Sequence, residues 1–171
     1  AAFIALAAAV MIGAPAVDAC DAWIQSVVFP LRADGITTVL AVATDLSDTL
    51  VSVVVAAAFV GYLALRISKR SAFVYASCVI AGEASVALAK LVVSRTRPIG
   101  MNLIEFPSDA SFPSGHTFAA IAIVSFALFV LMRTHPKMPA AGKVLLGAIA
   151  VAWPVFIAFT RIYLAAHWPT D

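Results

Sequence analysis

Residues 112–132, FPSGHTFAAIAIVSFALFVLM, decide the class of fold that we expect for this chain. From His116 onward the segment contains no Asp, Glu, Lys or Arg, and as a helix it is long enough to cross a hydrocarbon core of about 30 Å. Four further apolar runs predict spans near residues 1–17, 38–65, 72–93 and 144–165. The sequence therefore predicts an all-α, multi-pass transmembrane helical bundle that forms a single membrane-embedded domain over residues 1–171.

The composition agrees with this class of protein. The chain is 63% hydrophobic and only 12% charged, and its mean hydropathy is +1.03. Soluble proteins are nearer to half apolar and a quarter charged. The net charge of +2 and the lack of a long basic run exclude nucleic acid as an expected partner. Cys20 and Cys78 lie in different sequence contexts, so we predict no disulfide between them.

Two of the expected spans have irregular features. The apolar start of the chain resembles the remnant of a signal peptide, but it has no charged leading region, so we interpret it as a clipped first spanning helix. Residues 18–35 are expected to form an interfacial helix or loop. Asp45 and Asp48 interrupt the second run, which places the start of its buried part near Leu50.

The distribution of basic residues predicts an orientation in the membrane. Two short loops are rich in Lys and Arg and are therefore expected on the cytoplasmic side; their basic residues are Arg66, Lys69, Arg70, Arg133, Lys137 and Lys143. The span ends that carry Lys90, His116 and Arg161 then lie together on the outer face. Cations on that face oppose the usual bias, so they indicate either anion binding or contact with lipid headgroups.

Lys90 and Arg97 are seven residues apart, which is about two helical turns, and Pro98 favours the end of the helix before Arg97. The planar guanidinium fork matches the oxygens of a phosphate, and the ammonium group adds a compact charge. The pair therefore favours a tetrahedral oxyanion as ligand.

The sequence Pro113-Ser114-Gly115-His116 leads directly into an apolar run. Ser114 is a candidate N-cap, and Gly115 permits close approach of the backbone to a ligand. The N-terminus of a helix presents unpaired N–H groups and a positive dipole end, which bind phosphate well. An earlier Phe-Pro-Ser sequence at residues 106–108 is not followed by Gly and His, and we interpret it as loop.

Arg161 ends the last apolar run and is followed by His167 and Asp171. A carboxylate near a histidine can hold it in one tautomer and make it more basic. Asp171 is alternatively a helix cap, because residues 168–171 resemble the start of a helix.

Taken together, Lys90-x6-Arg97-Pro98, Pro113-Ser114-Gly115-His116 and Arg161-x5-His167-x3-Asp171 resemble the three signature blocks of the type 2 phosphatidic acid phosphatase superfamily. This superfamily also includes the vanadium haloperoxidases. The resemblance implies a six-helix core, of which the last helix is expected to be missing after Asp171. One departure is Thr160, which stands where the family usually has Ser.

The resemblance also implies a mechanism without metal or other cofactor. His167 would attack phosphorus and form a phosphohistidine, oriented by Asp171, while His116 would protonate the leaving oxygen. The phosphoryl oxygens would be held by Lys90, Arg97, Ser114, Gly115 and Arg161. The substrate would be a lipid phosphate: undecaprenyl pyrophosphate, phosphatidic acid or phosphatidylglycerol phosphate.

The sequence also allows two other functions, a vanadate-dependent haloperoxidase and a protein that only binds or transports phospholipids. The same blocks hold vanadate in haloperoxidases, although those proteins are larger and predominantly soluble. A protein that only binds or transports phospholipids would need the cations but neither histidine. We expect a multi-pass protein of a bacterial inner membrane, with its site on the extracytoplasmic face. Arg95 lies outside the matched positions, and its expected role is contact with a headgroup.

Overall fold

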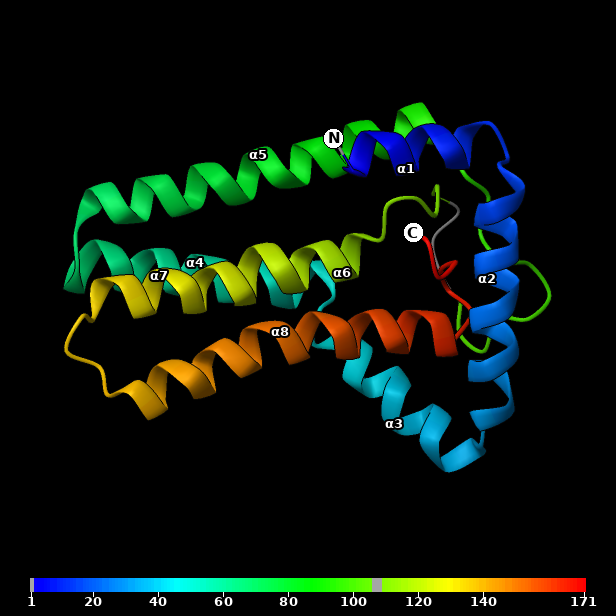
Figure 1. Cartoon of the computed structure of the whole chain (residues 1–171). Helices are drawn as coiled ribbons and strands as arrows, with labels where there is room; N and C mark the ends of the chain where they lie inside the picture. Colours follow the sequence, from blue (N-terminus) through cyan, green and yellow to red (C-terminus); the bar gives the residue numbers. More distant parts are fainter. Residues whose placement is uncertain (1, 106–108) are drawn as a thin grey trace. The chain divides into compact units, whose positions relative to one another are not determined.

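The computed structural model describes residues 2–105 and 109–171, so the loop expected at 106–108 lies outside the described residues. Within the described part of the chain every regular element is a helix (Figure 1). In chain order these are α1 (Ala2–Met11), α2 (Pro15–Val28), η1 (Phe29–Leu31), α3 (Asp34–Asp45), α4 (Thr49–Arg66), α5 (Lys69–Val93), α6 (Gly115–Ala119), η2 (Ala120–Ser125), α7 (Phe126–Thr134) and α8 (Ala140–Tyr163).

Four of the described helical segments are long and apolar enough to cross a membrane. They are Thr49–Arg66, Lys69–Val93, Gly115–Thr134 and Ala140–Tyr163. Ala2–Met11 and Pro15–Leu31 qualify only together and meet at an angle of 94°. The bend lies at Gly13, whose φ of +61° is a conformation that glycine adopts without strain. The predicted all-α, multi-pass architecture is thus confirmed.

The expected run at 38–65 contains two helices. α3 ends at Asp45, and α4 begins at Thr49 after a short turn. Asp48 occupies the N-cap of α4, where its Oδ2 accepts a hydrogen bond from the Leu50 backbone N–H at 3.4 Å. The helix that can cross a membrane therefore starts next to Leu50.

The described residues cluster into two compact units. Unit 1 contains Ala1–Thr44, Val86–Ser114 and Ala158–Asp171, and unit 2 contains Asp45–Ser85 and Gly115–Ile157.

The core of unit 2 centres on Tyr75, which is fully buried. Its hydroxyl donates to the carbonyl of Ile123 at 2.9 Å. Ile123 lies in η2, a π-helical segment between α6 and α7, and wider turns of this type loosen the regular hydrogen-bond ladder. Close packing on a small residue also stabilises this core. A Cβ atom at Gly82 would overlap the ring of Phe118, so the ring packs directly against the glycine backbone.

The core of unit 1 anchors the end of α8. Tyr163 is fully buried, and its hydroxyl accepts a hydrogen bond from the Ala33 backbone N–H at 2.9 Å. The carbonyl of Tyr163 accepts from Nε of Arg32, also at 2.9 Å. These bonds tie the end of α8 to the residues just before α3.

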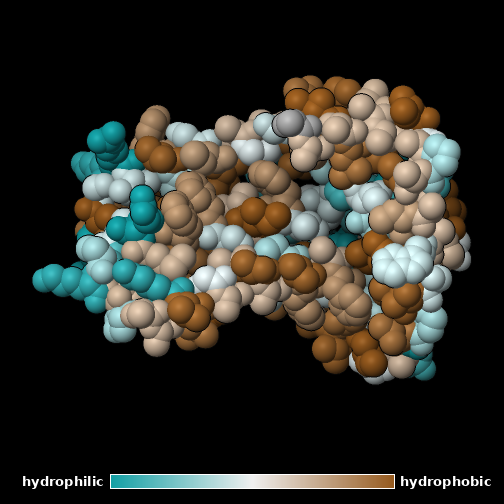
Figure 2. All heavy atoms as spheres, viewed as in Figure 1, coloured by the Kyte–Doolittle hydropathy of each residue, from teal (hydrophilic) through white to brown (hydrophobic). Residues whose placement is uncertain are grey.

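Apolar side chains cover much of the surface in Figure 2. On α5, for example, the exposed fractions of Phe73, Ile80 and Leu91 are 72%, 69% and 77%. Hydrophilic atoms gather where the α4–α5 turn and the α7–α8 loop of unit 2 lie (Figures 1 and 2). Apolar spans with polar ends are the pattern of a multi-pass membrane protein.

Candidate active site

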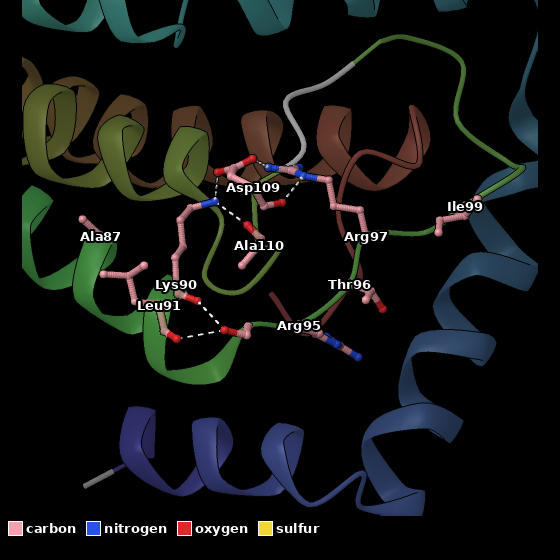
Figure 3. Close-up of a pocket in the computed structure, with 10 residues that line it drawn as sticks. Ala87, Lys90, Leu91, Arg95, Thr96, Arg97, Ile99, Asp109 and Ala110 are labelled. Carbon is pink, nitrogen blue, oxygen red and sulfur yellow. Dashed lines mark hydrogen bonds and ion pairs between the residues drawn. The ribbon is translucent and has the colours of Figure 1, made fainter.

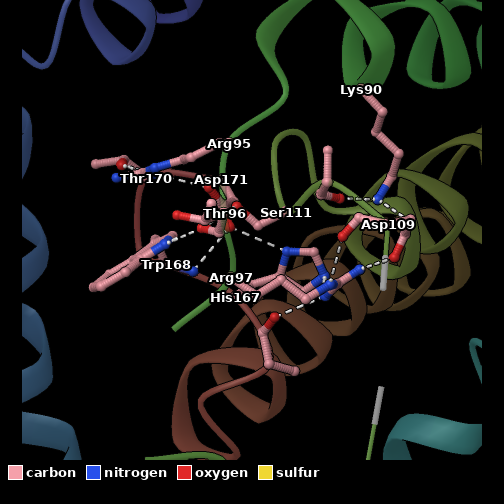
Figure 4. A network of polar contacts seen from close by, with 12 residues as sticks. Lys90, Arg95, Thr96, Arg97, Asp109, Ser111, His167, Trp168, Thr170 and Asp171 are labelled. Atoms are coloured by element: carbon pink, nitrogen blue, oxygen red, sulfur yellow. Dashed lines mark hydrogen bonds and ion pairs between the residues drawn. The ribbon is translucent and has the colours of Figure 1, made fainter. Parts of the chain in front are cut away.

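The residues after α8 fold into a tight turn that buries His167. The backbone N–H groups of Ala166 and His167 donate to the carbonyl of Arg161 at 3.0 and 3.3 Å. Ala165 adopts a φ of +51°, which reverses the chain. The side chain of His167 is thereby placed within the polar network of Figure 4, with an exposed fraction of 3%.

Asp171 lies beside His167 in this turn. Its Oδ2 is 3.1 Å from Nδ1 of His167 and accepts a second hydrogen bond from the Trp168 backbone N–H at 2.9 Å. The carboxylate is therefore a partner for the imidazole and also closes a turn at residues 168–171, where the structure has no helix for Asp171 to cap.

Arg97 contacts the other nitrogen of the imidazole. Its Nη1 lies 3.0 Å from Nε2 of His167 and 2.7 Å from the carbonyl oxygen of Ala166 (Figure 4). A guanidinium has donors only, so Nε2 is the acceptor in this contact. The proton of the neutral ring is then on Nδ1, where it is donated to Asp171. This tautomer places the ring's lone pair on Nε2, where it accepts the hydrogen bond from Arg97.

The surroundings of His167 favour its neutral form. Burial lowers the pKa of His167 to about 4, with further lowering by Arg97 and Arg161 and an opposing effect of Asp171. Although burial disfavours ionisation of Asp171, its hydrogen bonds with His167 and Trp168 and the charge of Arg95 hold its pKa below the usual range. At neutral pH the pair is an imidazole and a carboxylate.

Asp109 joins the two predicted phosphate-binding cations of the first block. Its Oδ2 is 2.6 Å from Nζ of Lys90, and its Oδ1 is 2.6 Å from Nη2 of Arg97 (Figure 3). Burial opposes the ionisation of Asp109, but these two partners hold its pKa below the usual range. Lys90 and Arg97 thus converge on one carboxylate in this structure, and their binding of a tetrahedral oxyanion stays a prediction.

A cavity of about 770 Å³ adjoins this pair within unit 1. Apolar side chains of Ala87, Leu91 and Ile99 line it together with Lys90 and Arg97 (Figure 3). A cavity with an apolar lining and cations suits an amphiphile that has an anionic head.

Arg161 is buried at the end of α8 and is held by α3. Its Nη1 donates to Oγ1 of Thr44 at 3.2 Å, and Thr160 donates to the same hydroxyl at 3.2 Å. Thr160, the departure from the family pattern, thus uses its hydroxyl to hold Thr44. Sequence reasoning did not single out Thr44.

The residues of the second block belong to both units. In unit 1 the backbone N–H of Ser114 donates to the carbonyl of Asp171 at 3.0 Å. Gly115 and His116 begin α6 in unit 2, where Nε2 of His116 lies 3.9 Å from Oδ1 of Asp48. Of the predicted site residues, unit 1 contains Lys90, Arg97, Ser114, Arg161, His167 and Asp171, and unit 2 contains Gly115 and His116.

The sequence analysis did not predict three acidic residues as partners of basic groups at the site. They are Asp21, Asp48 and Asp109. None has helical spacing to the group it contacts, so no periodic pattern could have found them. Arg95 is also placed differently from the expectation, because it pairs with Asp171 and Asp21 rather than extending toward a headgroup.

The family of the chain follows from its match to a family model. The model of the PAP2 superfamily matches residues 71–171, which include all three blocks. The chain belongs to the PAP2 superfamily.

Relatives with known names are similar over part of their length. An undecaprenyl-diphosphatase of Sulfolobus acidocaldarius is 32% identical over 98 residues, which cover 54% of this chain and 40% of the relative. The putative undecaprenyl-diphosphatase YbjG of Escherichia coli is 36% identical over 73 residues, or 43% of this chain and 31% of the relative. The matches thus span less than half of either relative.

A solved structure matches almost the whole chain. The crystal structure of a transmembrane PAP2 type phosphatidylglycerolphosphate phosphatase from Bacillus subtilis has a TM-score of 0.81 and 25% sequence identity. The match covers 99% of this chain and 82% of that structure. It supports the multi-pass helical fold.

Proposed function

We propose that this protein is a metal-independent phosphatase that hydrolyses a lipid phosphate or pyrophosphate in the membrane. His167 is the nucleophile, Asp171 orients it, and His116 is the general acid. Lys90, Arg97 and Arg161, with Ser114 and Gly115, hold the phosphoryl oxygens. Family membership supports the class of reaction, and the geometry around His167 supports the assignment of roles.

In the first step the lone pair on Nε2 of His167 forms a bond to phosphorus. The bond from phosphorus to the leaving oxygen breaks, and His116 donates its proton to that oxygen. The Nδ1 proton of His167 stays hydrogen-bonded to Asp171, which stabilises the positive charge of the phosphorylated ring. Phosphoryl transfer depends chiefly on positioning and on charge stabilisation, and the three cations supply both.

In the second step water attacks the phosphohistidine. His116, now neutral, accepts a proton from that water while the N–P bond breaks and its electron pair returns to Nε2. The products are inorganic phosphate, or a phosphate monoester if the transferred group carries a substituent, and the starting form of the enzyme.

The observation that carries this proposal is the state of His167. A nucleophilic histidine must be neutral at working pH and must carry its lone pair on the nitrogen that faces the anion site, so that it can attack when its hydrogen bond to Arg97 is given up. Here Nδ1 is hydrogen-bonded to Asp171 and Nε2 faces Arg97, a cation of the anion site. A protein that only binds phospholipids needs no such tautomer, and this observation favours the enzyme.

The substrate candidates are undecaprenyl pyrophosphate, phosphatidic acid and phosphatidylglycerol phosphate. The similar proteins from Sulfolobus acidocaldarius and Bacillus subtilis are named for the first and the third of these lipid types. The residues proposed for the site would hold only the phosphoryl group, so the lipid is decided by experiment. Oxidation of halide with bound vanadate is the competing enzymatic function.

We further propose a bacterial inner membrane as the location, with the site on the extracytoplasmic face. Within unit 2, His116 lies at the start of the span Gly115–Thr134 and Arg133 lies at its other end. The basic loop that contains Arg133 is expected on the cytoplasmic side.

The test is release of inorganic phosphate by the purified chain, with EDTA present, from undecaprenyl pyrophosphate, phosphatidic acid and phosphatidylglycerol phosphate. We expect release in EDTA and loss of release in His167→Ala. His135→Ala is the matched control, because His135 lies in the α7–α8 loop of unit 2 and should retain activity. Equal rates in parent and His167→Ala would exclude the mechanism. Halide oxidation with vanadate would favour the haloperoxidase.

A further inference from the structure

Arg95 bridges two carboxylates that are far apart in the sequence. Its Nη1 is 2.7 Å from Oδ1 of Asp171, and its Nη2 is 2.5 Å from Oδ2 of Asp21. Asp21 lies in α2 and is almost completely buried, with a side-chain exposure of 3%. Figure 4 shows Arg95 next to Asp171 and Thr170, and in Figure 3 its guanidinium points away from Asp109.

We propose that Arg95 and Asp21 are positioning residues that hold the Asp171 carboxylate against His167 and set the charge that the imidazole experiences. This inference rests on the proposed function for its catalytic meaning. Its structural content, the coupling of Asp21 and Arg95 to His167, can be tested without any turnover.

The arrangement fixes both oxygens of Asp171. Oδ2 accepts from His167 and from the Trp168 backbone, and Oδ1 accepts from Arg95. With one oxygen held on each side, the carboxylate cannot rotate away from the imidazole. Arg suits this task because its planar fork can donate to two carboxylates at once, which Lys cannot do in the same geometry.

Asp21 extends this support to the chain itself. Its Oδ1 accepts from the Thr170 backbone N–H at 2.9 Å, and its Oδ2 accepts from the Thr170 hydroxyl at 3.0 Å. Asp21 thereby holds the residue next to Asp171 as well as Arg95. A buried carboxylate is expensive unless it is paired and hydrogen-bonded, and the partners of Asp21 are Arg95 and Thr170, which both adjoin Asp171.

The charges around His167 predict that substitutions of Arg95 and Asp21 change its protonation in opposite directions. The charged groups that face the imidazole are Asp171, Arg97 and Arg161. Behind Asp171 lies Arg95, and behind Arg95 lies Asp21. Removing the cation Arg95 should make His167 easier to protonate, whereas removing the anion Asp21 should make it harder to protonate. A general loosening of the fold would expose His167 and make it easier to protonate in both variants.

The experiment is an NMR titration of the full chain in detergent micelles with 15N-labelled histidine. The variants are Arg95→Gln, Arg95→Lys and Asp21→Asn. Asp18→Asn is the matched control, because Asp18 is an exposed acid one turn earlier on the same helix. Circular dichroism and thermal unfolding confirm that each variant is folded.

We expect the titration midpoint of His167 to rise by about one pH unit in Arg95→Gln and to fall or stay in Asp21→Asn. Arg95→Lys should keep the midpoint, because it keeps the charge, and Asp18→Asn should match the parent. Unchanged midpoints in both Arg95→Gln and Asp21→Asn, or a rise in both, would overturn the proposal. If Arg95→Gln does not fold, a rise in Asp21→Asn alone would overturn it.

Steady-state kinetics test whether Arg95 contributes to catalysis. Arg95→Gln and Arg95→Lys should lower kcat on the order of 10- to 100-fold with little change in KM, because loss of orientation acts on the chemical step. A change in KM with constant kcat would assign Arg95 to substrate binding and overturn its positioning role. A parent that releases no phosphate would refute the proposed function, and the NMR result would still decide the coupling.

Discussion

Nη1 of Arg97 donates a hydrogen bond to Nε2 of His167 at 3.0 Å, while Nη2 of the same guanidinium is paired with Asp109 at 2.6 Å. One cation therefore connects the proposed nucleophilic nitrogen with the position of a bound anion. In the proposed mechanism a phosphoryl group takes the place of the Asp109 carboxylate on Arg97, with its phosphorus near Nε2 of His167. Arg97 would then align binding with attack.

The pH profile should carry the signature of a buried histidine. The pKa of His167 lies near 4 instead of its ordinary 6.5, and only the neutral ring is a nucleophile. As the pH rises through about 4, His167 loses its proton and kcat/KM should increase. We expect no further rise through pH 6.5. The measurement is kcat/KM from pH 3.5 to 8, and an ascending limb near 6.5 would contradict the burial of a neutral His167.

Asp109 should compete with phosphate for Lys90 and Arg97. Asp109→Asn removes the negative charge that both cations contact, so inorganic phosphate should inhibit more strongly. Because Asp109 is 45% exposed, we expect a modest change, about two- to five-fold in the inhibition constant. Glu105→Gln is the control, an exposed acid in the same loop. Weaker inhibition in Asp109→Asn would assign Asp109 to phosphate binding.

Thr44 should support Arg161. Thr44→Val removes a buried hydroxyl that accepts from both Arg161 and Thr160, and we expect the free energy of unfolding to fall by about 1–3 kcal/mol. KM should rise, because Arg161 loses one of its positioning contacts. Thermal unfolding and steady-state kinetics measure the two effects. Thr38→Val, on an exposed face of α3, should change neither, and equal effects of the two substitutions would refute the special role of Thr44.

The sequence blocks indicated which residues of the candidate site lie close together, and the reasons are local. His167 and Asp171 share one turn, and the spacing of Lys90 and Arg97 limits how far apart they can be. Asp21 and Arg95, in contrast, are 74 residues apart and come from a helix and an irregular loop. Hydrophobic periodicity carries no information on such a contact.

The fold also has features that the local sequence predicts and others that it does not. The apolar runs predicted the long spans because length and hydropathy suffice for that purpose. They could not place the 94° bend between α1 and α2, because Gly13 is a small residue within an otherwise uniform apolar run. The bend depends on backbone conformation, to which hydropathy is insensitive.

Packing in unit 2 gives a prediction on stability. Gly82→Ala places a methyl group against the Phe118 ring, so we expect destabilisation of about 1–3 kcal/mol. Gly61→Ala is the matched control, because a Cβ atom there has open space, and it should be neutral or stabilising. The stability of both variants is measured as the fraction of protein that stays folded in detergent after heating. Equal behaviour of the two variants would mean that Phe118 moves aside without loss.

The most direct test of the central claim is chemical trapping of the intermediate. The parent protein is mixed with substrate labelled with 32P on the terminal phosphate, quenched in alkali, digested and analysed by mass spectrometry. The account predicts a base-stable, acid-labile phosphoryl group on His167 that is absent from His167→Ala. Steady phosphate release by the parent with the label on another residue, or with no label on the protein within a single turnover, would contradict it.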